Sequence, residues 1–380
     1  MRLDIAYRLH FTYSAPVAES QNEVRVRPLD DVRQQVLSYR LTTTPATRVL
    51  QTRDYFGTTV DHLGIRSPHD DLLVVAEASV ETATTAAAHV PVTGERLREQ
   101  TFINQHFEYL TPSQHVQWGD LVDEVASWAV RDAADDVYEQ VLAVVRAVPT
   151  VLSYRRGSTA IGVTLEELID GGAGVCQDFA HLAVGMLRCI GVPARYVSGY
   201  LFALDETRLD EGSHDTEPHD ARLAGERPDG DLRSGRERAT AGAGGDARAE
   251  SGAAVGDQSA ARRPKSADPT AISVQTHAWI EAAVPGSGWL GLDPTNGGSV
   301  GERHVVIGHG RDYHDVPPVR GVFNGTAEAK VDAEVIIAQP SAPVSMVTEP
   351  IRRQTRVAVN AAPEVPTQQA AHQHQQQQQQ

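Results

Sequence analysis

Cysteine is scarce in this sequence, and its two copies, Cys176 and Cys189, stand close together in the chain. Two cysteines cannot form the disulfide framework that holds small secreted domains together. They are 13 positions apart on one predicted helix, so at about 1.5 Å per residue they would lie roughly 20 Å from each other. A disulfide joins Cα atoms less than about 7 Å apart, so we do not expect these two thiols to bond to each other.

Positive charge and long apolar runs are also in short supply. The 34 Lys and Arg residues are outnumbered by 50 Asp and Glu, and the formal net charge of -16 argues against nucleic acid or an anionic membrane as a partner. The first residues, MRLDIAYRLHFTY, carry charges and lack the apolar run of a secretory signal. No later stretch approaches the ~20 apolar residues of a membrane span. These absences predict a cytoplasmic protein without a membrane partner.

Motifs for metals and cofactors are missing too. No spacing of Cys and His suggests a zinc site, and no glycine-rich loop between a strand and a helix suggests a phosphate site. We therefore expect no metal and no bound cofactor. The oligomeric state is left open by the sequence.

The length and the changing patterns predict an α+β chain of several units. A single core rarely serves 380 residues, so two or three units are expected. Residues 1–85 contain short alternating runs with connectors at Tyr13 to Pro16 and at Asp54 to Gly57, which is typical of a small antiparallel β domain. Residues 86–204 and 271–338 together form the predicted second unit, in which helices and strands are mixed.

Helical spacing is clearest in the middle of the chain. Apolar residues recur near helical spacing from Trp118 to Val148, and Pro149 is expected to mark the end of that region. A short helix is expected from Thr164, and a strand over residues 192–202.

Two segments lack the composition of a folded core. Residues 205–270 contain no Ile, Phe, Tyr or Trp, so burial there cannot offset the entropy lost on ordering. Residues 339–380 are polar, contain Pro and end in a run of Gln. We predict a disordered insertion and a disordered Gln-rich tail.

Cys176 opens a predicted helix. The apolar residues after it form one stripe, which consists of Phe179, Leu182, Ala183, Met186 and Ile190. Gly191 and Pro193 end the helix, so Cys176 lies in its first turn. The helix dipole and the unpaired N–H groups favour a thiolate there and can also hold an oxyanion, while the glycines at 171–174 permit a close approach. The alternative is a small buried core residue, which is our interpretation of Cys189.

A nucleophilic cysteine needs a base. His181 follows Cys176 by five positions, which puts it about 140° around the helix, so we expect it to pack or bond inside the fold. His277 is the better candidate, because it begins an extended segment in which it shares one face with Trp279 and Glu281.

The hairpin after that segment decides whether Asp293 can orient His277. With an odd loop over residues 285–287, Asp293 comes opposite Trp279, on the His277 face. A loop of two or four residues without a bulge would put Asp293 on the other face. The plain structural alternatives are a strand histidine paired with backbone and an Asp-Pro turn that ends a strand.

Three blocks of the sequence carry a resemblance to a known family, namely GVCQDFAH with CIGVPARYVSGYL, THAWIEAAV, and WLGLDPTNG. Together they resemble the bacterial transglutaminase-like proteins of the papain-type cysteine-enzyme superfamily. The N-terminal stretch looks like the β domain that precedes the core in that family. The resemblance implies a papain-like core, in which a nucleophile helix packs on an antiparallel sheet, and a catalytic triad of Cys176, His277 and Asp293. The insertion of 66 residues at 205–270 departs from the shorter connection that is usual there.

The implied chemistry is attack on the amide bond of a peptide or protein. His277 would take the proton of Cys176, Asp293 would fix the imidazole tautomer, and the thiolate would form a thioester. The residues leave open whether the acyl group passes to an amine, as in a transglutaminase-like acyltransferase, or to water, as in a cysteine peptidase or amidase. The contrasting hypothesis is a non-catalytic module that binds a peptide.

Overall fold

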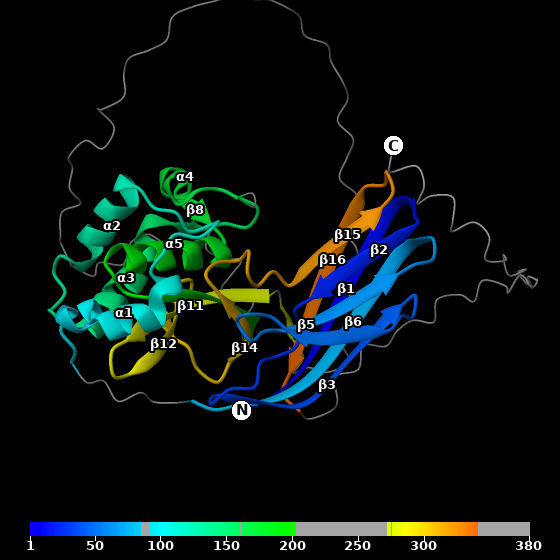
Figure 1. Ribbon diagram of the computed structural model, residues 1–380, viewed down its shortest axis with the longest axis horizontal. Coiled ribbons are helices and arrows are strands. Elements are labelled where there is room, and N and C mark those ends of the chain that lie inside the picture. Colours follow the sequence, from blue (N-terminus) through cyan, green and yellow to red (C-terminus); the bar gives the residue numbers. More distant parts are fainter. Residues whose placement is uncertain (85–90, 160–161, 203–271, 275, 341–380) are drawn as a thin grey trace, which may run out of the picture. The chain divides into compact units, whose positions relative to one another are not determined.

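The computed structural model describes residues 1–84, 91–159, 162–202, 272–274 and 276–340. The insertion predicted at 205–270 lies outside the described residues, as does the predicted tail apart from residues 339 and 340. Helices between residues 94 and 189 combine with antiparallel sheets on either side in the chain, which confirms the α+β class (Figure 1). No helix in the described ranges is long and apolar enough to cross a membrane.

An antiparallel β region precedes the helices, as the sequence predicts. Its strands are β1 (Arg2–Val17), β2 (Glu19–Val24), β3 (Gln34–Thr44), β4 (Val49–Arg53), β5 (Thr59–Ile65) and β6 (His69–Thr82). β1, β6 and β3 are neighbours in one sheet, and β2, β5 and β4 are neighbours in another. The predicted connector Tyr13 to Pro16 does not reverse the chain, because β1 continues through it with a break in its pairing to β6 between Thr12 and Val17.

The closing strands of the chain join this β region. β15 (Val319–Asn324) pairs with β2, and β16 (Ala329–Ala338) pairs with β1 and with β10 (Ile272–Val274). The sequence groups residues 271–338 with the second unit, whereas β15 and β16 within that range pair with strands of the N-terminal β region. The physical reason is that β1 and β2 each need a second neighbour to pair their outer N–H and C=O groups. That neighbour comes from the far end of the chain.

The helices are η1 (Gly94–Arg98), α1 (Gln100–His106), η2 (Phe107–Tyr109), α2 (Asp120–Val130), α3 (Val137–Val151), α4 (Leu165–Gly171) and α5 (Cys176–Cys189). The helical region predicted over 118–148 is divided into α2 and α3, and the Asp136 side chain caps α3. The prediction that Pro149 ends the helix is wrong by two residues. Pro149 lies in the last turn of α3, where its missing N–H removes only one hydrogen bond. Thr164 caps α4 in a capping box with Glu167.

A second antiparallel sheet carries α5. Its strands are β9 (Ala194–Leu201), β11 (Thr276–Val284), β12 (Gly288–Asp293), β13 (Gly298–Ser299) and β14 (His304–Gly310), in the order β13-β12-β11-β9-β14. Ala278, Ile280 and Ala282 of β11 belong to the same core cluster as the α5 stripe, which includes Phe179, Leu182, Ala183 and Met186. α5 lies along β11, with α2, α3 and α4 around it (Figure 1). Burial of this stripe holds the helix that begins at Cys176.

Polar contacts join the β region to the second sheet. The Tyr200 hydroxyl donates to the Val26 carbonyl at 2.8 Å. The Gln34 amide donates to the Val306 carbonyl at 2.7 Å and accepts from the Val306 N–H at 2.8 Å. The described residues accordingly all fall within one compact unit.

Candidate active site

Local backbone geometry places Cys176 in the first turn of α5. The residues before it form β8 (Ala173–Gly174), which pairs in parallel with β7 (Ser153–Tyr154). Gly172 turns the chain into β8 with a positive φ of 60°, a conformation that glycine adopts without steric cost. The sequence expectation that the helix begins at Cys176 is confirmed.

The start of α5 is capped by Asp178. Val175 stands at the N-cap position and has no side-chain acceptor, so the cap consists of the Asp178 Oδ2, which accepts from the Val175 N–H at 2.9 Å. The Thr159 hydroxyl donates to the same oxygen at 2.5 Å. A Cβ on Gly174 would lie 2.7 Å from the Asp178 Cβ. Glycine at 174 is therefore required for this cap.

The backbone of the first turn leaves donors for a ligand. The N–H groups of Asp178 and Phe179 bond to the Val175 carbonyl at 2.9 Å and 3.1 Å. Within the described part of the chain, the N–H groups of Cys176 and Gln177 have no backbone acceptor. Two such donors beside a thiol can stabilise negative charge on an oxygen.

The hairpin between β11 and β12 brings Asp293 to His277. Val284 pairs with Gly288, which confirms the predicted loop over residues 285–287 and puts Asp293 opposite Trp279. The His277 Nε2 and the Asp293 Oδ2 are 2.8 Å apart. The register therefore places both side chains as the odd loop requires.

Asp293 is a turn residue and a histidine partner at once. Its Oδ1 accepts from the backbone N–H groups of Thr295 at 3.0 Å and Asn296 at 3.2 Å, which closes the Asp-Pro turn. Its Oδ2 accepts from His277, from the Asn296 side chain at 2.7 Å and from the His304 Nε2 at 3.2 Å. Burial alone would raise the pKa of Asp293, but these hydrogen bonds hold it well below its ordinary value. The carboxylate is therefore ionised at neutral pH.

His277 also reaches Cys176. Its imidazole bonds to Asp293 through Nε2, and it lies close enough to Cys176 for that side chain to act on its pKa. Burial alone would lower the pKa of His277, whereas the hydrogen bonds and charges of Asp293 and Cys176 raise it to about 10. A charged imidazolium beside Cys176 is thus favoured near neutral pH. Of the three residues that the sequence selects, the structure bonds His277 to Asp293 and places both beside the start of α5, where Cys176 lies.

Trp279 and His304 lie beside His277 and Asp293. Neither His304 nor Asn296 is among the site residues that the sequence predicts. The Trp279 ring is fully buried and lies edge-on to the His304 ring, with 5.2 Å between their centroids. The centroids of the Trp279 and His277 rings are 6.0 Å apart. Asn296 belongs to the WLGLDPTNG block, so the Asp-Pro turn was a usable signal for it. No local signal marks His304, which the order of the strands brings to Asp293.

His277, Asp293 and His304 also form a set that a metal ion can use, because one ligand atom from each lies within 4.8 Å of the others. The His304 ring argues against that use. Its Nδ1 accepts from the Gly301 N–H at 3.2 Å, so the ring proton is on Nε2 and points at Asp293. Metal ligation through Nε2 requires a free lone pair there and a proton on Nδ1. The set is arranged for hydrogen bonding.

The two other candidates from the sequence have structural partners. His181 is buried and accepts from the Tyr313 N–H at 3.1 Å, and burial lowers its pKa to about 3, so it is neutral. The Cys189 Sγ donates to the Asp123 Oδ1 at 3.1 Å, and burial together with Asp123 raises its pKa to about 12. The interpretation of His181 is confirmed, because it bonds inside the fold. Cys189 is half-buried against the core cluster rather than fully buried, and its thiol stays protonated.

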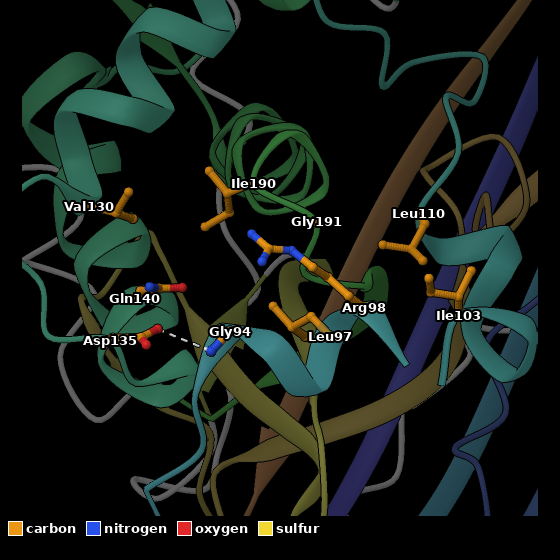
Figure 2. A pocket seen from close by; sticks show the side chains of 10 residues that line it. All are labelled: Gly94, Leu97, Arg98, Ile103, Leu110, Val130, Asp135, Gln140, Ile190 and Gly191. Carbon is orange, nitrogen blue, oxygen red and sulfur yellow. Dashed lines mark hydrogen bonds between the residues drawn. The ribbon is translucent and has the colours of Figure 1, made fainter. Parts of the chain in front are cut away.

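A cavity lies at the opposite end of α5. Its volume is about 420 Å³, and its lining includes Arg98, Asp135, Ile190 and Gly191 (Figure 2). Gly191 follows the end of α5, whereas Cys176 begins it, and 14 residues at about 1.5 Å each separate the two by roughly 20 Å. The lining is open and mixed, with Arg98 and Asp135 both exposed. None of the lining residues belongs to the Cys176 site.

Comparisons with known proteins match both parts of the chain. Residues 3–81 match the bacterial transglutaminase-like N-terminal region, and residues 124–294 match the core of the transglutaminase-like superfamily. The chain belongs to the transglutaminase-like superfamily. Cys176, His277 and Asp293 all lie inside the second match.

Relatives and one solved structure match most of this chain. An uncharacterized protein of Mycobacterium leprae is 28% identical over 338 residues, which are 89% of this chain and 99% of the relative. An uncharacterized protein of Mycobacterium tuberculosis is 28% identical over 357 residues, which are 87% of this chain and 90% of the relative. The crystal structure of a candidate cysteine protease of Cytophaga hutchinsonii has a TM-score of 0.57 at 20% identity and covers 91% of this chain and 92% of that one. This last likeness confirms the fold.

Proposed function

We propose that this transglutaminase-like chain is a cysteine enzyme that acts on amide bonds of peptides or proteins through a thioester on Cys176. One observation carries the proposal: His277 bonds to Asp293 at 2.8 Å and lies beside Cys176, which begins a helix. Membership of the superfamily supports a peptide or protein as the substrate. The triad is the proposed catalytic set.

The proposed reaction begins with transfer of the Cys176 proton to His277. The thiolate attacks the amide carbonyl carbon, and the N–H groups of Cys176 and Gln177 are placed to stabilise the oxyanion. His277 then returns a proton to the leaving amine, so that the C–N bond breaks and a thioester remains on Cys176. A second amine or a water molecule attacks the thioester, loses its proton to His277 and releases the acyl group.

Asp293 and Trp279 serve this sequence in different ways. Asp293 holds the His277 proton on Nε2 in the neutral ring, so that Nδ1 can accept the thiol proton. The buried Trp279 ring lies against His277 and keeps water away from its Asp293 side. The Asp293 carboxylate therefore stabilises the charge of the His277 imidazolium without screening by water.

The experiment that tests the proposal supplies a glutamine-containing peptide with and without a fluorescent primary amine. Entry of the amine into the product, lost in Cys176→Ala, supports an acyltransferase, whereas release of ammonia without entry supports a hydrolase. The reactivity of the thiols is measured in parallel with iodoacetamide near neutral pH, followed by peptide mapping. No product, together with equally slow labelling of Cys176 and Cys189, would show that the chain is a non-catalytic module.

A further inference from the structure

His304 stands outside the proposed triad, yet its ring is fixed at both nitrogens. The Nδ1 accepts from the Gly301 N–H at 3.2 Å, and the Nε2 donates to the Asp293 Oδ2 at 3.2 Å. The turn that holds Gly301 is itself closed, because the His304 N–H donates to the Gly301 carbonyl at 3.0 Å. A flipped ring would put carbon atoms at both contacts, so only this orientation satisfies both partners.

The surroundings of His304 leave the ring little freedom. Its side chain is 11% exposed, and the buried indole of Trp279 lies edge-on against it. The space beside it, which Gly301 and Val306 also line, is only about 10 Å³, about the size of one water molecule. The donor that His304 offers to Asp293 is therefore pre-oriented and shielded.

Asp293 has a demanding position to keep. Its Oδ1 is held by the backbone of the turn, so the direction of Oδ2 depends on side-chain donors. Those donors are His277, Asn296 and His304. Asn296 belongs to the same turn, whereas His304 approaches from β14 and ties Oδ2 to a different strand of the sheet.

We infer that His304 is a positioning residue, whose Nε2–H holds the Asp293 carboxylate in the orientation that His277 needs. The inference rests on the proposed function, because it assigns His304 a part in activating Cys176. His304 acts through Asp293 and touches no reacting atom.

Two isosteric variants separate the proposed role from a purely structural one. In His304→Gln the side-chain amide lies where the Nε2–H was and keeps the donor to Asp293. In His304→Asn the amide oxygen lies where Nδ1 was and keeps the acceptor for Gly301, but the donor to Asp293 is lost. A residue that only supports the Gly301 turn would tolerate Asn better than Gln, so the two roles predict opposite results.

The measurement is the rate of iodoacetamide labelling of Cys176 in the full chain as a function of pH. A hydrogen bond to a charged group contributes enough to change a rate about ten-fold, so His304→Asn is expected to label about ten-fold more slowly at about pH 6.5. The loss is expected because a less firmly held Asp293 stabilises the His277 imidazolium less, which lowers the pKa of His277. His304→Gln is expected to stay within about three-fold of the wild type. Thermal unfolding of both variants checks that they are folded.

Labelling of His304→Asn at the wild-type rate, or of His304→Gln as slowly as His304→Asn, overturns the inference. Failure of the proposed function looks different, because wild-type Cys176 then labels slowly and His277→Ala changes nothing. Should either variant not fold, ring nitrogen NMR of the wild-type chain with labelled histidine decides the matter. A His304 ring whose Nε2 carries a proton and whose Nδ1 accepts a hydrogen bond supports the inference, and a ring whose only proton is on Nδ1 overturns it.

Discussion

Replacement of Asp293 by Asn separates the two parts that this side chain plays. The Asn Oδ1 can still accept from the N–H groups of Thr295 and Asn296, so the turn is kept. The Asn NH₂ group then takes the place of Oδ2 and faces the His277 Nε2. Because two donors repel, the neutral imidazole must move its proton to Nδ1, the nitrogen that the proposed mechanism uses as the base. His277 in that tautomer cannot accept the thiol proton.

The size of the effect follows from the electrostatics of His277. The rise of its pKa from 6.5 to about 10 corresponds to about 5 kcal/mol in favour of the charged ring, even though burial works against that charge. Asp293 and Cys176 share this stabilisation. A hydrogen bond to a charged group contributes about 1.5 to 3 kcal/mol, so loss of the Asp293 carboxylate should slow labelling of Cys176 near pH 6.5 roughly 10- to 150-fold.

The assay is iodoacetamide labelling with peptide mapping, and Asp123→Asn is the matched control. Asp123 is the carboxylate beside Cys189, where it raises the pKa of that thiol, so its loss should speed labelling of Cys189 and leave Cys176 unaffected. Asp293→Asn should act in the opposite sense on Cys176 alone. Wild-type labelling of Cys176 in Asp293→Asn would refute the role given to the carboxylate.

Two further predictions concern stability and the start of α5. Glu281 is 1% exposed and is paired with Arg33, Arg195 and His309. Burial alone would raise the pKa of Glu281, but these partners hold it well below 4.5. Its stabilisation is therefore present above about pH 4.5 and lost below it. Glu281→Gln should lower the free energy of unfolding by about 3 kcal/mol at pH 7 in urea melts, with the gap to wild type narrowing below pH 4.5. An unchanged urea midpoint at pH 7 would contradict this. In Gly174→Ala the new Cβ should clash with Asp178, which should slow the labelling of Cys176 and lower the free energy of unfolding by about 1 to 3 kcal/mol. Gly171→Ala has open space around its Cβ and should be tolerated. Equal behaviour of the two variants would remove the reason given for the glycine.

Local patterns were sufficient for the parts of the site that depend on neighbours in the chain. The apolar stripe after Cys176 predicted a helix on a core, and the odd loop over 285–287 predicted the face of Asp293, since register in a hairpin follows from loop length. The plain alternatives for Asp293 proved compatible with its proposed role, because one carboxylate oxygen closes the turn while the other bonds His277.

Contacts set by the order of strands were beyond the sequence. The contact between His304 and Asp293 depends on the strand order β12-β11-β9-β14 in one sheet. The pairing of β16 with β1 joins strands from opposite ends of the chain. Neither pairing leaves a periodic signal in a single sequence. The predicted helix end at Pro149 is wrong for a different reason. Pro149 lies in the last turn of α3, where the helix tolerates the loss of one backbone hydrogen bond. The cytoplasmic location, the disorder of 205–270 and the choice between amine and water stay predictions.

Acylation of the Cys176 thiol tests most directly whether this residue is a nucleophile that needs His277. The full chain is mixed with an activated ester of a short peptide, quenched in acid, and mapped by mass spectrometry. The predicted result is one acyl group on Cys176, which neutral hydroxylamine releases as it does a thioester. In His277→Ala this group should form at least about 100-fold more slowly. Acylation of Cys189 at a similar rate, or of Cys176 equally fast without His277, would contradict it.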